Sequence, residues 1–357
     1  MKYGGKTAVK TYLLPHTGTF YKANLHTHTT LSDGKFTPEE VKAAYAERGY
    51  SIVAFTDHEI FLPHNDLTDE TFLALNAHEV SISESADKSK RARKTYHLNF
   101  YAKSPDVTVS PLFSESRVFF ASTKPLVTDE MRAAEPLQIF YSVDSINHLI
   151  RVGNENGFFV NYNHPIWSLQ QYPDYIGLKG LFGIEVYNNA CARMELKDSC
   201  VPFDDLLRAG NDLFPICSDD SHKDVDRFGG WTMVKAEKLT YECVIDALLS
   251  GAFYSTTGPE IMDLWIENGT LFVRASKDCS AVKVVTDWRA DCQKRHFPED
   301  VGDANLVTVP IVPFAKKYCE RNYPDWEGSY FRLEVEGEGG KCAYTRAFRF
   351  DDLKEIL

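Results

Sequence analysis

The chain has 357 residues, of which 43% are hydrophobic and 25% are charged, values typical of a globular protein. Its formal net charge of −12 disfavours non-specific binding to nucleic acid or to an anionic membrane surface, because both are themselves negatively charged. No apolar run approaches the length of a membrane span and the N-terminus has no secretory pattern, so we expect a cytoplasmic protein. The eight cysteines include no C-x-x-C pair, which indicates reduced thiols.

Strand and helix patterns alternate through residues 1–258. Thr37 is the predicted N-cap of the first helix, because Pro38 stands at the first helical position and Glu40 lies three residues after the cap. In chain order, the pattern predicts a strand over 21–26, a helix over 38–48, strands over 51–55, 74–83 and 96–102, a helix over 143–156, strands over 158–160 and 183–186, a helix over 203–209, a strand over 213–217 and a helix over 241–249. This alternation favours an α/β architecture with a mainly parallel sheet.

Two parts of the chain depart from this alternation. Residues 103–137 interleave Ser, Pro and Lys without a regular period, so we interpret them as an insertion or long loop. After Gly258 the sequence consists of short alternating runs separated by turn residues such as Asn268 and Gly269. We therefore expect an α/β domain over 1–258 and an all-β, sandwich-like domain of unknown role over 259–357.

Histidines and carboxylates recur at the ends of the predicted strands. His26 and His28 end the first strand and point to the same side of an extended backbone, because they are two residues apart. His58, His164 and His222 follow later strands. In a β/α barrel the carboxyl ends of the strands meet at one face, so we expect these side chains to lie together. The predicted metal ligands are His26, His28, Asp33, His58, Glu79, His97, His164, Asp220 and His222.

A mixture of His and carboxylate ligands suits Zn, Mn or Fe, whereas a site made only of carboxylates and water would suit Mg. Adjacent metals activate a bridging water and hold the oxygens of a phosphate ester during its displacement. A small phosphorylated substrate is compatible with the negative chain, because bound metals reverse the local charge. A lone histidine near a strand end is usually structural. The prediction of a metal site therefore depends on several strand ends in one domain each carrying a histidine.

Polar side chains close to these motifs are candidates for substrate binding. Lys223 and Arg227 follow the last His-rich motif, and either could orient a phosphate, with a structural salt bridge as the alternative for Arg227. His64 follows the second motif and could line the rim of the pocket. Glu185 could orient a metal-binding histidine, or it could be an ordinary capping carboxylate.

Together the motifs resemble the PHP family, the polymerase and histidinol phosphatase domain of metal-dependent phosphoesterases. The matching segments are His26-x-His28, Leu-Ser-Asp33-Gly, Thr-Asp-His58, His164-Pro and Asp220-x-His222. The resemblance covers roughly residues 21–258 and leaves the C-terminal β-rich part outside it. It implies a distorted (β/α)7 barrel that holds two or three divalent transition metals, Zn, Mn or Fe.

The resemblance also implies a ligand set for each metal. It places the first metal on His26, His28, Glu79 and Asp220, the second on Glu79, His97 and His164, and the third on Asp33, His58 and His222. A metal-bridging hydroxide would then be the nucleophile, with Asp220 and His222 as the catalytic residues. With an aspartate at position 33, the first motif resembles that of the family members that act on nucleotide phosphates.

Two other functions stay open at this point. The domain could be a non-catalytic binding or regulatory module that holds metals without turnover. It could also be an amidohydrolase-type C–N hydrolase, although the usual metal-bridging lysine of those enzymes has no counterpart at the strand ends. The sequence does not specify the substrate, the general acid or the oligomeric state, and the net charge disfavours a long nucleic acid.

Overall fold

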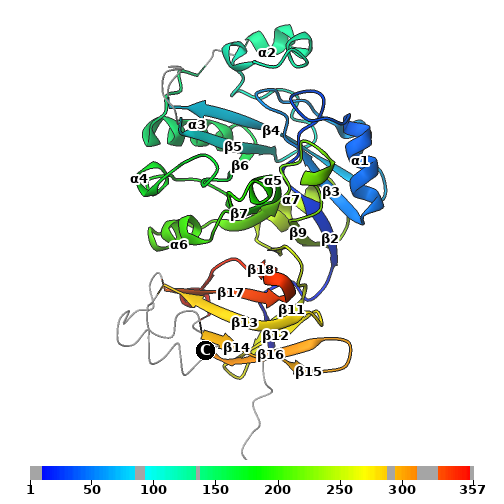
Figure 1. Cartoon of the computed structure of the whole chain (residues 1–357), viewed down its shortest axis with the longest axis vertical. Helices are drawn as coiled ribbons and strands as arrows, with labels where there is room; N and C mark the ends of the chain where they lie inside the picture. The colour runs from blue at the N-terminus through cyan, green and yellow to red at the C-terminus, as the bar shows by residue number, and fades with distance from the viewer. Residues whose placement is uncertain (1–9, 85–92, 134–136, 288–293, 312–328, 354–357) are drawn as a thin grey trace, which may run out of the picture. The chain divides into compact units, whose positions relative to one another are not determined.

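The computed structural model describes residues 10–84, 93–133, 137–287, 294–311 and 329–353. Contacts between residues divide the chain into two units: Thr19–Ser255, and a second unit that combines Met1–Gly18 with Thr256–Leu357. The elements of both units are labelled in Figure 1. Among the described residues, no helix has both the length and the apolar character needed to cross a membrane.

The unit Thr19–Ser255 is built on a mixed sheet with the strand order β10-β9-β2-β3-β4-β5-β6-β7-β8. Pairing is parallel through β2, β3 and β4 and again through β6, β7 and β8. The strands are β2 (Thr19–Asn24), β3 (Tyr50–Phe55), β4 (Leu73–Ser83), β5 (Thr95–Ala102), β6 (Phe158–Tyr162), β7 (Gly183–Asn188), β8 (Phe214–Ser218), β9 (Trp231–Ala236) and β10 (Phe253–Thr256).

Helices alternate with these strands, as the sequence predicted. They are α1 (Pro38–Glu47), α2 (Asp129–Ala133), α3 (Val143–Glu155), α4 (Tyr172–Tyr175), α5 (Asn189–Arg193), α6 (Val201–Arg208) and α7 (Tyr241–Leu249), with short 3-10 turns η1 (Asn65–Leu67), η2 (Glu115–Arg117), η3 (Lys124–Leu126) and η4 (Asp224–Asp226). The predicted cap of α1 is confirmed: Thr37 accepts from the backbone of Glu40, and the Glu40 side chain accepts from the backbone of Thr37.

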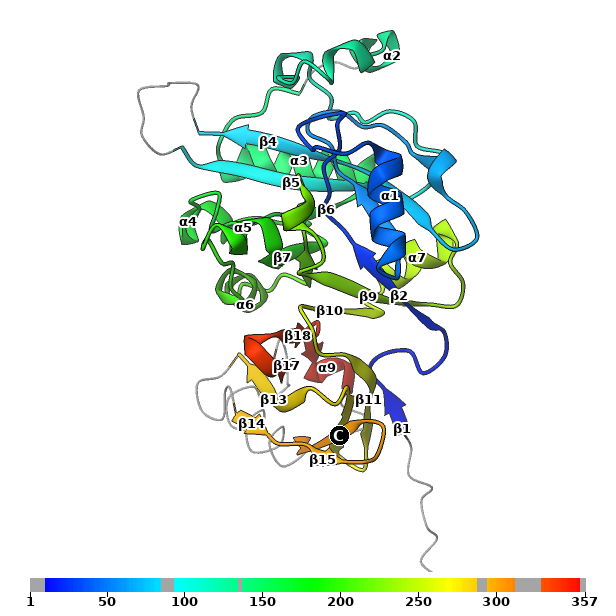
Figure 2. The ribbon, with the colours of Figure 1, turned by 45° about the vertical axis from the view of Figure 1, so that its right-hand side comes forward.

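The sheet is less parallel than predicted, because β5 runs antiparallel to both β4 and β6. Parallel neighbours need a crossover of about a dozen residues or more, usually a helix, and the chain between Ser83 and Thr95 is too short to form one. The two long strands β4 and β5 therefore lie side by side as a hairpin in Figures 1 and 2.

A closed (β/α)7 barrel is not seen within the described part of the chain, where β8 pairs with β7 and ends the strand path. Side-chain hydrogen bonds link β8 to β9 and β10. Thr232 Oγ1 on β9 donates to the Cys217 carbonyl at 3.5 Å, and Ser255 Oγ on β10 donates to the Pro215 carbonyl at 2.8 Å.

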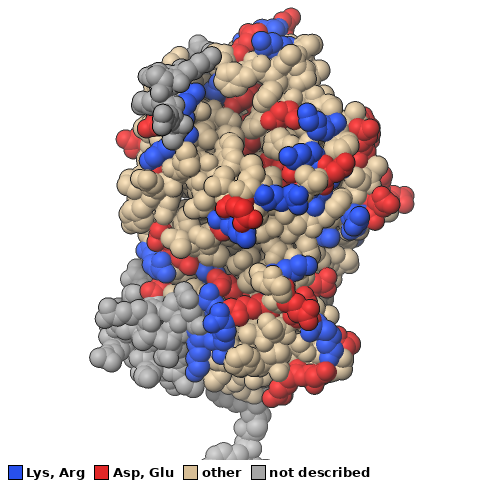
Figure 3. Space-filling view, in the orientation of Figure 1, with Lys and Arg blue, Asp and Glu red and all other residues tan. Residues whose placement is uncertain are grey.

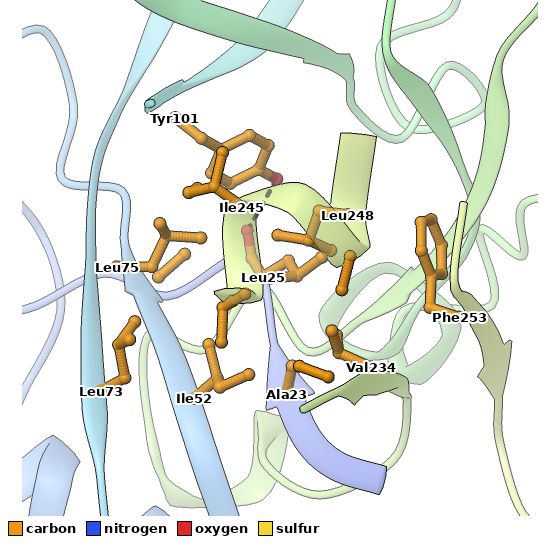
Figure 4. Packing of buried hydrophobic residues seen from close by; sticks show 14 of the residues in the cluster. Ala23, Leu25, Ile52, Leu73, Leu75, Tyr101, Val234, Ile245, Leu248 and Phe253 are labelled. Carbon is orange, nitrogen blue, oxygen red and sulfur yellow. Dashed lines mark hydrogen bonds between the residues drawn. The ribbon is translucent and has the colours of Figure 1, made fainter. Parts of the chain in front are cut away.

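Figure 4 shows a hydrophobic core of this unit. Ile52, Leu75 and Val234 pack there from neighbouring strands, together with Leu25, the residue before His26. Full burial of a side chain such as Ile52 stabilises the fold by roughly 1.5–3 kcal/mol. The hydroxyl of Tyr101 donates to the Leu25 carbonyl at 2.8 Å, so the core also fixes the backbone from which His26 projects.

The second unit is rich in strands. Its first sheet has the order β1-β11-β12-β16-β15, and its other ladders join β13 to β14 and β17, and β17 to β18 and β19. Strand β1 from the N-terminal end of the chain pairs with β11, which the sequence patterns did not predict. The elements are β1 (Lys10–Tyr12), β11 (Ile261–Glu267), β12 (Thr270–Ala275), β13 (Cys279–Thr286), β14 (Lys294–His296), β15 (Glu299–Asp300), β16 (Asn305–Pro310), β17 (Tyr330–Gly337), η5 (Glu338–Gly340), β18 (Cys342–Tyr344), β19 (Phe348–Arg349) and α9 (Phe350–Leu353).

Candidate metal centre

The first and last His-rich segments are joined by backbone hydrogen bonds. His26 and His28 follow β2, and Asp220 and His222 follow β8. The N–H of Asp220 donates to the His26 carbonyl at 3.0 Å, and the N–H of His28 donates to the Ser221 carbonyl at 3.0 Å. These two bonds hold together side chains that are far apart in the sequence.

Glu79, which is 1% exposed, lies at the centre of the cluster. It stands in the middle of β4, and its carbonyl accepts from the N–H of Glu59 at 2.8 Å, which holds the end of β3 beside it. Its carboxylate oxygens lie 3.1 Å from His97 Nδ1, 3.2 Å from His58 Nδ1, 3.4 Å from His26 Nε2, 3.4 Å from His28 Nε2 and 3.5 Å from His164 Nε2. Its two oxygens face different histidines, so Glu79 is placed to serve two neighbouring cation sites.

Asp220, which follows β8, faces three of the histidines that surround Glu79. Its Oδ1 lies 3.2 Å from His26 Nε2 and 3.1 Å from His28 Nε2, and its Oδ2 lies 3.7 Å from His164 Nε2. Asp220 Oδ1 and His28 Nδ1 are both buried, and neither makes a hydrogen bond within the described part of the chain. Buried polar atoms normally have a hydrogen-bond partner. These two atoms lie among His nitrogens and carboxylate oxygens, and such a group of atoms can ligate a cation.

Asp33, His58 and His222 form the more open side of the cluster. Asp33 Oδ2 lies 3.4 Å from His222 Nε2 and 3.8 Å from His58 Nε2, and Asp33 Oδ1 lies 3.6 Å from His28 Nδ1. The side chains of Asp33 and His222 are 29% and 31% exposed. This side is therefore the one that solvent and a substrate reach first.

Four groups of side chains in the described residues place one donor atom each within 4.8 Å of one another. They are His28–Asp33–His58–His222, His26–His164–Glu185, His26–His28–Glu79 and His58–Glu79–His97. His, Asp and Glu in such groups are of the kind that holds divalent metals. Glu185, which the resemblance did not include among the ligands, belongs to one of them.

Hydrogen bonds made by the Nδ1 atoms of His26 and His222 orient these two rings. His26 Nδ1 lies 2.8 Å from Glu185 Oε1, and His222 Nδ1 lies 2.9 Å from the backbone carbonyl of Asp220. A carboxylate or carbonyl oxygen can only accept, so Nδ1 donates in both cases. In the neutral ring the Nε2 lone pair then points inward, which is the arrangement of metal-binding histidines.

The charges of the cluster shift its pKa values in both directions. Burial acts to lower the pKa of His164, but the hydrogen bond to Glu79 and the charges of Asp220, Glu185 and Glu79 together outweigh it and raise the pKa to about 9. Burial also acts to lower the pKa of His222, but the charge of Asp220 and the hydrogen bond and charge of Asp33 together outweigh it and raise the pKa to about 9. Burial and the charge of His28 lower the pKa of His58 to about 3. Burial acts to raise the pKa of Glu79, but the surrounding histidines hold it well below its usual value, so this ligand is ionised.

Glu185 on β7 ties three parts of the cluster together. In addition to His26 it accepts from the backbone N–H of His164 at 2.9 Å, from Asn188 Nδ2 at 3.0 Å and from Ser218 Oγ. Asn188 Nδ2 also donates to Asp220 Oδ2 at 3.1 Å. Of the two roles considered for Glu185 from the sequence, these contacts fit the orientation of a histidine.

Asp57, which the sequence analysis did not single out, orders the loop that carries Asp33. Its carboxylate accepts from the Thr29 N–H at 2.8 Å, from Thr29 Oγ1 at 2.7 Å and from Ser32 Oγ at 2.5 Å. The signal that could have found it is its position directly before His58, since the segment that delivers a ligand also delivers its neighbour.

Three backbone positions in the cluster are conformationally special. His164 has φ 26° and Asp220 has φ 51°, in the left-handed region that non-glycine residues rarely adopt, and such strain gathers at functional sites. A Cβ at Gly34 would lie 2.4 Å from the His28 carbonyl oxygen. Only glycine therefore lets the Asp33 loop lie this close to His28.

A cavity of about 560 Å³ opens onto the cluster. Trp167 forms part of its wall, and its ring centroid lies 5.1 Å from that of His164 and 5.4 Å from that of His97. Among the lining residues are the predicted ligands Asp33, His58, Glu79, His97, His164, Asp220 and His222, the basic residues Lys35, Arg193 and Lys223, and the apolar residues Trp167, Met194 and Val225. Lys35 and Arg193 were not predicted as site residues, because they lie outside the His-rich motifs.

Two predicted substrate ligands are not among the residues that line this cavity. The Arg227 guanidinium lies 4.0 Å above the ring of Phe36 and pairs with Asp224 at 3.1 Å, in line with the structural alternative. His64 is buried, with its ring centroid 4.8 Å from that of Phe55. Lys223 does line the cavity.

No family model and no curated protein sequence matches the chain. Among solved structures, it is similar to a two-domain protein from Bacteroides vulgatus containing a predicted PHP-like metal-dependent phosphoesterase, at 14% identity and a TM-score of 0.40, covering 97% of this chain and 100% of that one. An amidohydrolase from Chromobacterium violaceum, solved with sulfate and no metal, has 17% identity, a TM-score of 0.35 and coverage of 56% and 87%. A protein from Bifidobacterium adolescentis, whose name proposes a metal-dependent phosphoesterase, has 15% identity, a TM-score of 0.34 and coverage of 66% and 97%.

Proposed function

We propose that the chain is a metal-dependent hydrolase that cleaves a phosphate ester of a small molecule. The observation that carries the proposal is the convergence of His and carboxylate donors around Glu79 and Asp220, with two buried donor atoms that lack a hydrogen bond within the described residues. The mixed N and O donors suit Zn, Mn or Fe. Ions held there would supply Lewis-acid stabilisation of the phosphoryl oxygens and would lower the pKa of water.

The proposed ligands are those named from the sequence, divided by geometry into two halves. His26, Glu79, His97, His164 and the supporting Glu185 form the inner half of the site, and Asp33, His58 and His222 form the outer half. His28 and Asp220 lie between the halves and contact both. His222 Nδ1 donates a hydrogen bond to the backbone carbonyl of Asp220, so His222 Nε2 is directed toward Asp33 and the open side.

Basic side chains on the cavity wall would bind the phosphate. Lys35, Arg193 and Lys223 line the cavity, and no ion pair of theirs occurs among the described residues. Such unpaired cations attract an anionic group and orient it. Trp167 and Met194 offer apolar contact to the organic part of the substrate.

A small substrate fits the surface better than a long nucleic acid does. On the face shown in Figure 3, acidic and basic residues are interspersed, and the net charge of −12 opposes the approach of a polyanion. We also propose that the strand path from β2 to β8 is a distorted (β/α)7 barrel, supported by the backbone hydrogen bonds that join the segment after β2 to the segment after β8. The role of the β-rich unit stays open.

The test is elemental analysis of the purified protein, paired with release assays on phosphate monoesters, phosphate diesters and amides. We expect bound transition metal and release of phosphate, with both lost in a His26→Ala/His28→Ala variant. Metal without turnover of any substrate would favour the binding module, and turnover of amides alone would favour the amidohydrolase. A folded, metal-supplemented protein that holds no metal would contradict the proposal.

A further inference from the structure

The insertion predicted over residues 103–137 packs against the outer half of the metal site. Its apolar side chains Phe113, Val118, Val127 and Met131 form a small buried cluster with Ile60. Ile60 lies two residues after His58, so the hydrophobic contacts of the insertion are made on the segment that presents this ligand.

A buried ion pair joins the insertion to the same segment. Arg117 Nε lies 2.8 Å from Glu59 Oε2, and these side chains are 13% and 2% exposed. Glu59 follows His58 directly, has φ 62°, and also accepts from the Ser81 N–H at 2.7 Å. The pair therefore connects the insertion to the segment after β3, which carries His58, and to β4, which carries Glu79.

Three more contacts reach the ligand His58 and the loop before Asp33. The ring of Phe120 stacks on that of His58, with centroids 5.7 Å apart and an interplanar angle of 24°. Ser122 Oγ donates to the Ser32 carbonyl at 2.8 Å, and Thr123 Oγ1 donates to the Leu31 carbonyl at 2.6 Å. These carbonyls lie one and two residues before Asp33.

The contacts are confined to one side of the site. Across the described ranges, no hydrogen bond or ring contact joins residues 103–133 to His26, His97 or His164. The inner ligands are held by strands and by Glu185, whereas Asp33 and His58 have neighbours supplied by the insertion.

We infer that the segment from Ser110 to Met131 is a positioning element for the cation site formed by His28, Asp33, His58 and His222, so that occupancy of this site depends on the insertion. The inference rests on the proposed metal centre and adds to it a structural control of one site. Groups that orient metal ligands change metal affinity by about 10–100-fold when removed, and we expect an effect of that size here.

The test compares Phe120→Ala with Phe119→Ala, its immediate neighbour, which is 67% exposed and serves as the matched control. Metal-stripped proteins would be titrated with Zn²⁺ by calorimetry, and bound Zn would be counted by elemental analysis after dialysis. We expect Phe120→Ala to weaken one Zn²⁺ site by about 10–100-fold, while the other sites of this variant and all sites of Phe119→Ala match the wild type. If Phe120→Ala does not fold, Ser122→Ala/Thr123→Val removes the hydrogen bonds to the Asp33 loop and leaves the apolar cluster intact.

The outcomes separate this inference from the proposed function. Identical Zn²⁺ binding in the wild type and in both test variants would overturn the inference. Selective loss of one site in a protein that hydrolyses no substrate would support the inference and count against the proposed function. A wild type that binds no Zn²⁺ would overturn both.

Discussion

In the inner half of the candidate metal centre, His26, Glu79 and Glu185 are 0%, 1% and 0% exposed, whereas Asp33 and His222 in the outer half are 29% and 31% exposed. The inner ligands stand on strands or directly after them, above a hydrophobic core. The outer ligands stand on loops that depend on Asp57, Gly34 and the insertion. From this difference we expect that substitutions near the outer half weaken its cation site without disturbing the inner half.

The largest expected effect comes from removing an inner ligand. His26→Ala takes away the ring that faces both Glu79 and Asp220, so we expect loss of bound metal and a fall of hydrolysis to the background rate. Elemental analysis and a phosphate-release assay would measure both. The matched control is His148→Ala, on α3 and outside the cavity lining.

The same two assays on Asp33→Asn compare the loss of an outer ligand with the loss of the inner ligand His26. We expect this outer variant to keep the inner metal and to recover activity when metal is added in excess. Equal and irreversible loss in His26→Ala and Asp33→Asn would mean that the two halves form one cooperative site.

The next largest effect concerns the stability of the outer half. Arg117→Gln leaves the Glu59 carboxylate buried without its partner, so we expect the free energy of unfolding to fall by about 3 kcal/mol. Arg132→Gln breaks an ion pair whose partners are 43% and 60% exposed, and it should cost less than about 1 kcal/mol. Denaturant unfolding measures both variants, and similar values for the two would contradict a structural role of the buried pair.

A smaller effect is expected from the residue that orients His26. Glu185→Gln removes the charge that fixes the proton on His26 Nδ1 but keeps the size of the side chain, and we expect metal affinity to fall by about 10-fold. Glu185→Ala also releases the His164 backbone and should approach a 100-fold loss. Metal titration would measure these changes against Glu155→Gln on the exposed end of α3, and an unchanged affinity in Glu185→Ala would remove Glu185 from the site.

The smallest effect is a dependence on pH. The pKa values of His164 and His222 are raised to about 9 in the folded protein, so metal must displace protons from these rings below that pH. We expect metal affinity to rise between pH 6.5 and about 9. The raised pKa values also stabilise the metal-free fold, a contribution that is complete below about pH 6.5 and is lost as the pH rises through about 9. Metal titrations and thermal unfolding of stripped protein across this range would check both, and a flat profile would contradict the protonated state of these histidines.

The local elements and the candidate ligands were predictable from short stretches of the chain. The capping box at Thr37, the strand before His26 and the helix over 143–156 depend on neighbouring residues, and the structure has them where the patterns predicted. The ligand types were also readable, because His and carboxylates at strand ends are a property of short segments.

How these segments meet depends on contacts between residues that are far apart in the chain. The antiparallel pairing of β5 with β4 brings His97 to Glu79, the pairing of β1 with β11 joins the N-terminal end of the chain to the β-rich unit, and the stacking on Phe36 keeps Arg227 out of the cavity wall. The contacts of Phe120 and Arg117 with the outer half likewise join residues distant in sequence. Such contacts follow from chain packing and from the burial of particular charges, and periodicity within a short segment carries no information about either.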